Sequence, residues 1–261
     1  MEYNFSEDLK SIREILGFSQ SELAEKIGVE QVTISRTELK KTEPSARLLE
    51  AVYSFAFDKN IKINKLKEMF WRDDLGANEK LLFHGAKTEI DGEIDIHKGR
   101  KNNDFGQGFY LTTSKELAES FLRTSIAKAI ATGTIEEGQK FGYISTFEFN
   151  LSGNLETHIF ENADVDWLHC IAAHRKKKMF IEVEREMARY DIIAGKIADD
   201  ATNATLTAYL AGVFGTAGDK EADDFCIRQL LPNKLKDQYC FKTESAIECL
   251  KFVKGEKIWL K

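Results

Sequence analysis

Hydrophobic and polar positions follow a helical period through the first 70 residues. Phe5, Leu9, Ile12 and Leu16 recur at the spacing of one helix face and predict a first helix. The alternation of single apolar and polar residues that marks a strand is not found in this part of the sequence. The first part of the chain is therefore expected to be all-helical.

Short signals mark where the next helices begin and end. Ser19 and Glu22 form a capping box that predicts the start of a second helix, and Gly28 is expected to end it. A third short helix is expected at about residues 30–39, and Pro44 suits the first turn of a fourth. Apolar residues at helical spacing predict a fifth: Ile63, Leu66 and Phe70.

The pattern changes near residue 75. Beyond residue 80, short apolar runs bounded by glycines alternate with helical stretches, which is typical of an α+β domain. The polar segment 73–79 carries the break signals of a linker. We therefore expect two domains, an all-α domain at residues 1–72 and an α+β domain at residues 80–261.

The stretch SQSELAEKIGVEQVTISRTE, residues 19–38, resembles the helix-turn-helix of phage repressors of the Cro/CI or XRE type. The resemblance covers about residues 5–70 and implies a motif core of Ala24, Val29 and Ile34. It implies that Gln20 contacts a DNA phosphate. It also implies that four residues face the major groove: Gln31, Val32, Thr33 and Arg36.

Charge leaves a second interpretation of this domain open. The whole chain has a net charge of −6, and residues 1–70 hold 11 Lys and Arg against 12 Asp and Glu. Affinity for DNA depends largely on neutralising phosphates, so this balance is poor for a DNA-binding domain. The alternative is a helix-turn-helix used for dimerisation or partner docking. The basic run 175–178 is interpreted as a solvated helix end, with a nucleic-acid patch as the alternative.

Targeting signals and cysteine usage indicate a cytoplasmic protein. The start MEYNFSEDLK lacks a basic segment followed by an apolar run, and no uncharged apolar stretch of about 18 residues occurs. The four cysteines form no C-x-x-C pair, which fits a reducing compartment. We expect no membrane contact. His169, Cys170 and His174 have loose metal-ligand types, but no cysteine pair completes a tetrahedral ligand set, so we also expect no metal site.

The second half carries the candidate chemistry. The apolar run Leu81–Phe83 predicts a strand that ends at His84 and Gly85, where a ring nitrogen and a bare backbone could approach a ligand. Further along, Gly106 and Gly108 precede a predicted strand at residues 109–111. The glycine spacing matches neither a dinucleotide fingerprint nor a phosphate-binding P-loop, which argues against dehydrogenases and kinases.

A capping box of Thr113 and Glu116 is expected to open a long helix after that strand. The segment GxGFYLTTSKELAESF, together with HG at residues 84–85, resembles ADP-ribosyltransferases of the poly-ADP-ribose polymerase and diphtheria-toxin type. A nearer similarity is to a bacterial domain family of unknown function grouped with these transferases. It is marked by HG, DFGxGFYLTT, YDIIxGxxADD and QYCFKT in this order, over about residues 80–255.

The resemblance implies an ADP-ribosyltransferase-like α+β fold and a His-Tyr-Glu site for NAD as donor of ADP-ribose. In such a site His84 would bond a ribose hydroxyl, the Gly85 backbone would pair with the carboxamide, and Tyr110 would stack on the nicotinamide. Gln238 stands where the family has glutamate. A neutral amide can hold a hydroxyl but supplies no charge, so chain elongation is not expected.

Several further residues are candidates for binding. Arg100 and Asp104 are expected near the diphosphate or adenosine, with a solvated loop as the alternative. The resemblance adds Gly108 and Phe121 to the NAD-binding set. Two acidic residues are candidates for binding the acceptor, or for capping a helix: Asp199 and Asp200.

These observations lead to a main hypothesis and two rivals. The main one is an NAD-dependent mono-ADP-ribosyltransferase or slow NAD hydrolase with a DNA-binding or docking domain, acting as a bacterial toxin or antiphage effector. That biological setting is an analogy of architecture. The first rival is a non-catalytic transcription regulator whose second domain senses NAD or a related nucleotide, and which binds operator DNA as a homodimer. The second rival is a pure interaction protein. The acceptor, protein or nucleic acid, is not readable from the sequence.

Overall fold

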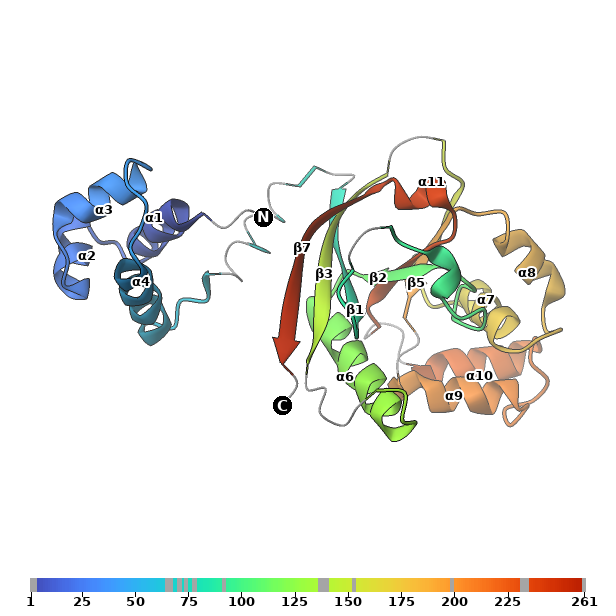
Figure 1. The fold of residues 1–261 in the computed structure, drawn as a ribbon. Helices are drawn as coiled ribbons and strands as arrows, with labels where there is room; N and C mark the ends of the chain where they lie inside the picture. The colour runs from blue at the N-terminus through green and yellow to red at the C-terminus, as the bar shows by residue number, and fades with distance from the viewer. Residues whose placement is uncertain are drawn as a thin grey trace. The chain divides into compact units, whose positions relative to one another are not determined.

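A computed structural model describes residues 4–63, 68–69, 72, 75–76, 79–90, 93–135, 141–151, 154–197, 200–230 and 235–259. The chain divides into two compact units, Met1–Gly76 and Ala77–Lys261, which are drawn in Figure 1. The division falls within residues 73–79, which were predicted as a linker. None of the helices in the described ranges is long and apolar enough to cross a membrane.

The first unit is helical, as its period predicts. Its helices are α1 (Phe5–Ile15), α2 (Gln20–Ile27), α3 (Gln31–Glu38) and α4 (Ala46–Asp58). Their apolar faces share one core, in which Ala24 and Ile34 are buried and Val29 is partly buried. The predicted core of the helix-turn-helix motif is therefore confirmed.

The helix ends follow the local signals with one exception. Both halves of the capping box of Ser19 and Glu22 are present, and Gly28 ends α2 in a left-handed conformation with φ of 69°. The prediction for Pro44 was wrong, because the Ser45 hydroxyl accepts from the Leu48 amide and α4 begins after it. Of the predicted fifth helix, Leu66 and Phe70 lie outside the described residues.

Within the described residues, the second unit is an α+β domain built on a seven-stranded sheet of order β4-β5-β6-β2-β1-β3-β7. The strands are β1 (Glu79–Ala86), β2 (Phe109–Thr112), β3 (Phe141–Asn150), β4 (Thr157–Ile159), β5 (Ile192–Lys196), β6 (Asp237–Phe241) and β7 (Leu250–Trp259). The helices are η1 (Ile96–Lys98, a 3₁₀ turn), α6 (Lys115–Ala131), α7 (Val165–Arg175), α8 (Ile181–Met187), α9 (Asp200–Leu210), α10 (Lys220–Leu230) and α11 (Glu244–Ile247).

The sheet has a hydrophobic core on each face. On one face, Cys240 of β6 points into a core made largely by α7, α9 and α10, with Trp167 and Tyr209 at its centre. On the other face, Phe147 and Phe241 lie in a second core that η1 and α11 help to cover. Alternate residues of a strand point to opposite faces, so the central strands contribute to both cores.

Strands β1 and β2 touch only briefly. Their register consists of Phe83 opposite Thr112, whereas β1 pairs with β3 along its whole length and β2 pairs with β6 along its whole length. In Figure 1, β1 runs down the view and β2 runs across it. The middle of the sheet therefore opens between these two strands.

Two sequence predictions near this opening are corrected. The first strand does not end at His84, because pairing with β3 continues through Ala86. The capping box of Thr113 and Glu116 was also wrong. Ser114 caps α6 by accepting from the Leu117 amide, and the Glu116 carboxylate accepts from the Ser114 hydroxyl.

Candidate functional site

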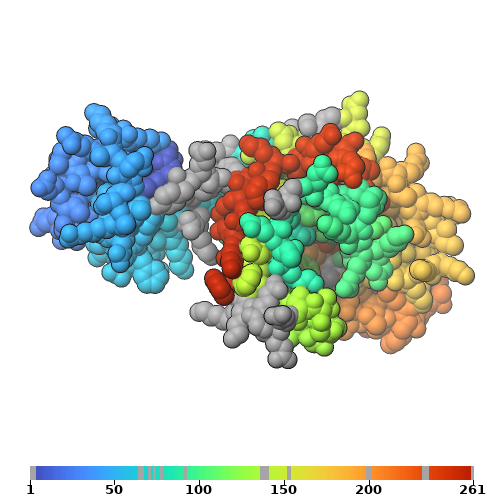
Figure 2. Space-filling model, in the orientation of Figure 1, coloured from blue at the N-terminus to red at the C-terminus, as the bar shows by residue number. Residues whose placement is uncertain are grey.

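A cleft of about 850 Å³ lies where β1 and β2 separate, and His84, Gly85, Tyr110 and Gln238 all line it. This volume is in the range of small-molecule sites. The walls come from both faces of the sheet, since Ile94 packs against one core whereas Leu210 of α9 packs against the other. In Figure 2 a hollow opens on this unit among the teal and green atoms of the segment that carries β1 and β2.

The His84 ring has a fixed tautomer. Its Nδ1 lies 2.7 Å from the carbonyl oxygen of Tyr110, and its ring centroid lies 4.6 Å from that of Phe109. A carbonyl oxygen only accepts, so Nδ1 carries the proton. Burial lowers the pKa of His84 below its ordinary value. The neutral ring therefore presents Nε2 as a hydrogen-bond acceptor.

The side chains of Phe109 and Tyr110 point to opposite faces of β2. Tyr110 packs against the core that contains Cys240, and its hydroxyl donates to the Gly106 carbonyl (2.8 Å) and accepts from the Phe105 amide (3.0 Å). Burial raises the pKa of the phenol well above its ordinary value, so the proton is retained. Tyr110 and His84 thus reach one cleft from two faces, and the phenol also holds the loop before β2.

Two cleft glycines are required by close packing. A Cβ at Gly85 would collide with the backbone oxygen of Ala118 in α6. A Cβ at Gly108 would lie 2.6 Å from both Cys240 Sγ and the Phe241 oxygen of β6. Neither glycine has a positive φ. Their small size lets α6 and β6 approach the strands that border the cleft.

A polar network spans the cleft floor. The Gln238 amide nitrogen donates to Asp104 Oδ2 at 2.8 Å, and Arg175 binds Oδ1 of the same carboxylate through Nε (2.8 Å) and Nη2 (2.6 Å). Arg175 Nη1 donates to Asn203 of α9 at 2.9 Å. All four residues line the cleft.

This network changes the roles inferred from the sequence. Asp104 lies beside Gln238 and not in a solvated loop. The first residue of the basic run, Arg175, is not a solvated helix end, because it is ion-paired inside the cleft. Local sequence gives no signal for this pairing, because 71 positions separate the two partners.

The remaining candidates differ in outcome. Arg100 is exposed and does not line the cleft, whereas its neighbour Lys98 does. Phe121 lines the cleft with 42% of its surface exposed. Asp199 lies outside the described residues. Asp200 is the first residue of α9, and the structure describes its backbone but not its side chain.

His169 and His174 make hydrogen bonds within this unit, and the four cysteines are buried. His169 Nε2 lies 2.7 Å from the buried carboxylate of Asp223, and His174 Nδ1 lies 2.8 Å from the Cys170 oxygen. Burial raises the pKa of Cys240 to about 12, so this thiol is not a nucleophile at neutral pH. Across the described ranges, no three His, Cys, Asp or Glu side chains are grouped to hold a metal ion.

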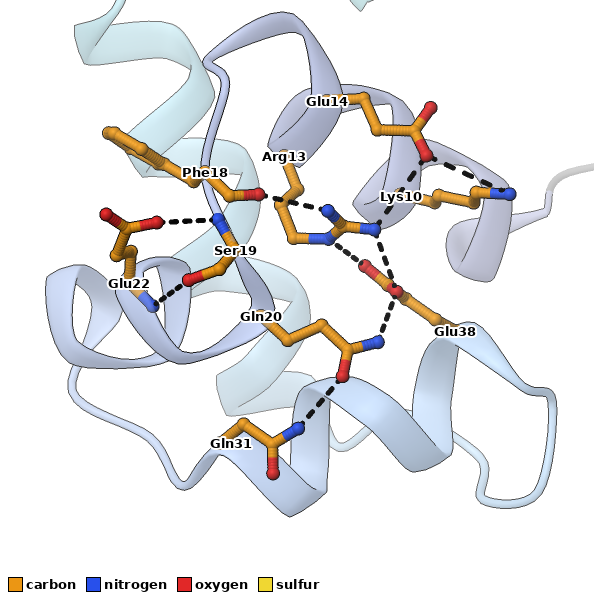
Figure 3. Close-up of polar contacts among 9 residues, drawn as sticks. All are labelled: Lys10, Arg13, Glu14, Phe18, Ser19, Gln20, Glu22, Gln31 and Glu38. Atoms are coloured by element: carbon orange, nitrogen blue, oxygen red, sulfur yellow. Dashed lines mark hydrogen bonds and ion pairs between the residues drawn. The ribbon is translucent and has the colours of Figure 1, made fainter.

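The helix-turn-helix unit presents α3 to solvent. Gln31, Val32 and Arg36 are exposed and Thr33 is half-buried, which suits the four residues expected to face DNA. Both polar atoms of the Gln20 side chain have partners within the protein, because Gln31 donates to its oxygen (2.9 Å) and its nitrogen donates to Glu38 (2.8 Å). Figure 3 shows this chain of contacts between the starts of α2 and α3.

Glu38 is the centre of that chain. It accepts from Arg13 Nε at 2.7 Å and from Nη2 at 3.2 Å, and this bond raises the pKa of Arg13 (Figure 3). Arg13 also donates to the Phe18 carbonyl at 3.0 Å. The position of Gln31 on the exposed end of α3 is therefore tied through side chains to α1.

Comparison with protein families agrees with this two-part organisation. Residues 81–252 match the family described as protein of unknown function (DUF3990), and this match spans more than half of the chain. The chain belongs to this family. Residues 9–52 match the family described as helix-turn-helix. No curated protein matches the chain.

Proposed function

We propose that the second unit binds NAD in the cleft and transfers its ADP-ribose group to an acceptor. The observation that carries the proposal is the convergence of His84, Gly85, Tyr110 and Gln238 on one cleft from three strands. These are the residues that the resemblance to ADP-ribosyltransferases selects. Their convergence supports the proposal because the three strands that carry them, β1, β2 and β6, are far apart in sequence.

The chemistry breaks the bond between ribose C1′ and nicotinamide nitrogen, whose electron pair leaves with nicotinamide. An acceptor nucleophile bonds to C1′ and loses its proton. The residues would act by orientation and charge stabilisation. Neutral His84 accepts from a ribose hydroxyl through Nε2, and the Tyr110 ring covers one side of the nicotinamide. Lys98 is the lining cation best suited to a phosphate.

Gln238 limits what this site does. Its side chain carries no charge, so it cannot stabilise the positive charge that develops on the sugar or act as a general base. Activity is therefore expected to be mono-transfer or slow hydrolysis. The same feature favours a second candidate function, in which the cleft binds NAD as a signal without turnover.

For the first unit we propose binding to operator DNA through α3, as a regulator. The exposure of Val32 and Arg36 and the ordered Gln31 support this proposal. The balance of 11 basic and 12 acidic residues in residues 1–70 means that affinity would depend on base contacts more than on phosphate attraction.

One experiment separates these functions. The purified full-length chain is incubated with NAD labelled in its adenosine part, with and without cell extract. Label in macromolecules supports transfer, and labelled ADP-ribose alone supports hydrolysis. Binding by calorimetry without either product supports the sensor. The absence of both binding and turnover would overturn the NAD proposal.

A further inference from the structure

The side chain of Gln238 is almost fully enclosed, with 5% of its surface exposed. On β6 it lies between Thr112 of β2 and Gly195 of β5, and it lines the cleft. Its one side-chain hydrogen bond to the described residues runs from its nitrogen to Asp104 Oδ2. This contact decides how the amide is turned.

A carboxylate only accepts hydrogen bonds, so the Gln238 nitrogen must face Asp104. The carbonyl oxygen Oε1 must then point away from Asp104. None of the described residues donates to Oε1. The side chain therefore offers the cleft an acceptor and keeps its donor occupied.

Asp104 is itself held firmly. Arg175 binds its Oδ1 at 2.6 and 2.8 Å and is anchored in turn to Asn203. The backbone that follows Asp104 is fixed by the Tyr110 hydroxyl, which contacts Phe105 and Gly106. The orientation of the Gln238 amide is thus determined by a chain of contacts reaching α7, α9 and β2.

We propose that Asp104 is a positioning residue that turns the Gln238 amide so that Oε1 accepts a hydrogen bond from a hydroxyl of the nicotinamide ribose. This inference rests on the proposed NAD site. Glutamine is then the matched partner of Asp104 and not a weakened glutamate. A carboxylate at position 238 would face the Asp104 carboxylate at hydrogen-bond distance, and like charges this close repel.

The test uses four full-length proteins: wild type, Asp104→Asn, Gln238→Glu, and the double variant. NAD affinity is measured by calorimetry, and folding by thermal unfolding. Asp104→Asn lets the amide at 238 turn its nitrogen to the cleft, and Gln238→Glu creates the repelling pair. We expect each single variant to lose about tenfold or more in affinity. In the double variant the new amide at 104 donates to the new carboxylate at 238, so affinity should return to within about threefold of wild type.

A second readout isolates the hydroxyl. Two NAD analogues are used, each lacking one hydroxyl of the nicotinamide ribose. Wild type should bind NAD more tightly than the analogue that lacks the hydroxyl bonded to Gln238 Oε1. Asp104→Asn should lose that preference, which a merely structural role would not change. Asp166→Asn, a surface carboxylate of α7 outside the cleft, is the matched control and should bind like wild type.

The outcomes separate the two proposals. If wild type does not bind NAD, the proposed function fails and this inference fails with it. If wild type binds but the double variant shows no rescue, or Asp104→Asn keeps the hydroxyl preference, the inference alone is overturned. Should Asp104→Asn fail to fold, Gln238→Glu still decides, since higher affinity than wild type would contradict the matched pair.

Discussion

Nδ1 of His84 lies 2.7 Å from the carbonyl oxygen of Tyr110, so one contact links β1 and β2 close to the point where they separate. The bond uses the backbone of Tyr110 and leaves its ring to the opposite face. It also keeps Nε2 of the imidazole without a proton in the neutral form. This relationship gives the first prediction its sign.

Burial lowers the pKa of both His84 and His174, so the folded chain binds their protons less readily than the unfolded chain does. As pH falls below about 6.5, the unfolded state takes up these protons first, and the free energy of unfolding decreases. His84→Gln should remove part of this slope, at most about 1.4 kcal/mol per pH unit. Urea unfolding of the full chain between pH 5 and 7 measures it.

The exposed His97 is the matched control for that experiment. His97→Gln makes the same substitution at an exposed position outside the cleft, so it shows the effect of the substitution itself. An equal slope in the His84→Gln variant would contradict the buried, neutral state of His84.

The hydroxyl of Tyr110 should matter apart from its ring. Tyr110→Phe keeps the ring but leaves the Phe105 amide without its acceptor, which should cost about 1–3 kcal/mol of unfolding free energy. It should also weaken NAD binding by loosening the loop that carries Asp104. Tyr110→Ala should cost more, about 3–5 kcal/mol, because it also opens a cavity. Urea unfolding and calorimetry test both effects.

Tyr143→Phe serves as the control for Tyr110→Phe, because Tyr143 lies on β3 outside the cleft. Its stability and NAD affinity should match those of wild type. NAD affinity unchanged in Tyr110→Phe would show that the loop does not depend on the hydroxyl.

Gly85→Ala should destabilise the second unit by about 1–3 kcal/mol, because the new methyl group meets the Ala118 oxygen and α6 must shift. Gly255→Ala is the matched strand control. Its Cβ would lie 3.4 Å from the nearest atom, Glu89 Oε1, which is ordinary contact. The midpoint of thermal unfolding compares the two, and equal midpoints would contradict the close approach of α6.

Arg36→Ala should weaken specific DNA binding by about 1–3 kcal/mol if Arg36 contacts a base, and should leave NAD binding unchanged. Sites are first selected from a random DNA pool and then tested by gel retardation. Lys10→Ala on α1 removes the same charge outside α3 and should have a smaller effect. Equal retardation by wild type and Arg36→Ala would favour the docking function.

The local part of the fold was predictable from sequence. Ser19, Gly28 and the apolar period of α1 act on their immediate neighbours, and so do the apolar runs that form parts of β1 and β2. Errors arose where two residues compete for one role. Ser114 replaced Thr113 as the cap, and Ser45 displaced Pro44 from the first turn.

The site was predictable only in part. His84, Tyr110 and Gln238 came from ordered motifs, and they line one cleft. The partner of Asp104 could not be predicted, because Arg175 is brought to it by the packing of α7 on the sheet. Arg100 was chosen for its nearness in sequence, although the chain turns its neighbour Lys98 to the cleft instead.

Because β1 and β2 pair only at Phe83 and Thr112, the sheet consists of two parts, β4-β5-β6-β2 and β1-β3-β7, joined by a single residue pair. Within each part, neighbouring strands pair over several residues, whereas the two parts do not pair in this way with each other. A ligand bound between the two parts would contact both of them and hold them together. A bound ligand would then make the whole domain more rigid, and without a ligand the two parts of the sheet would move more independently.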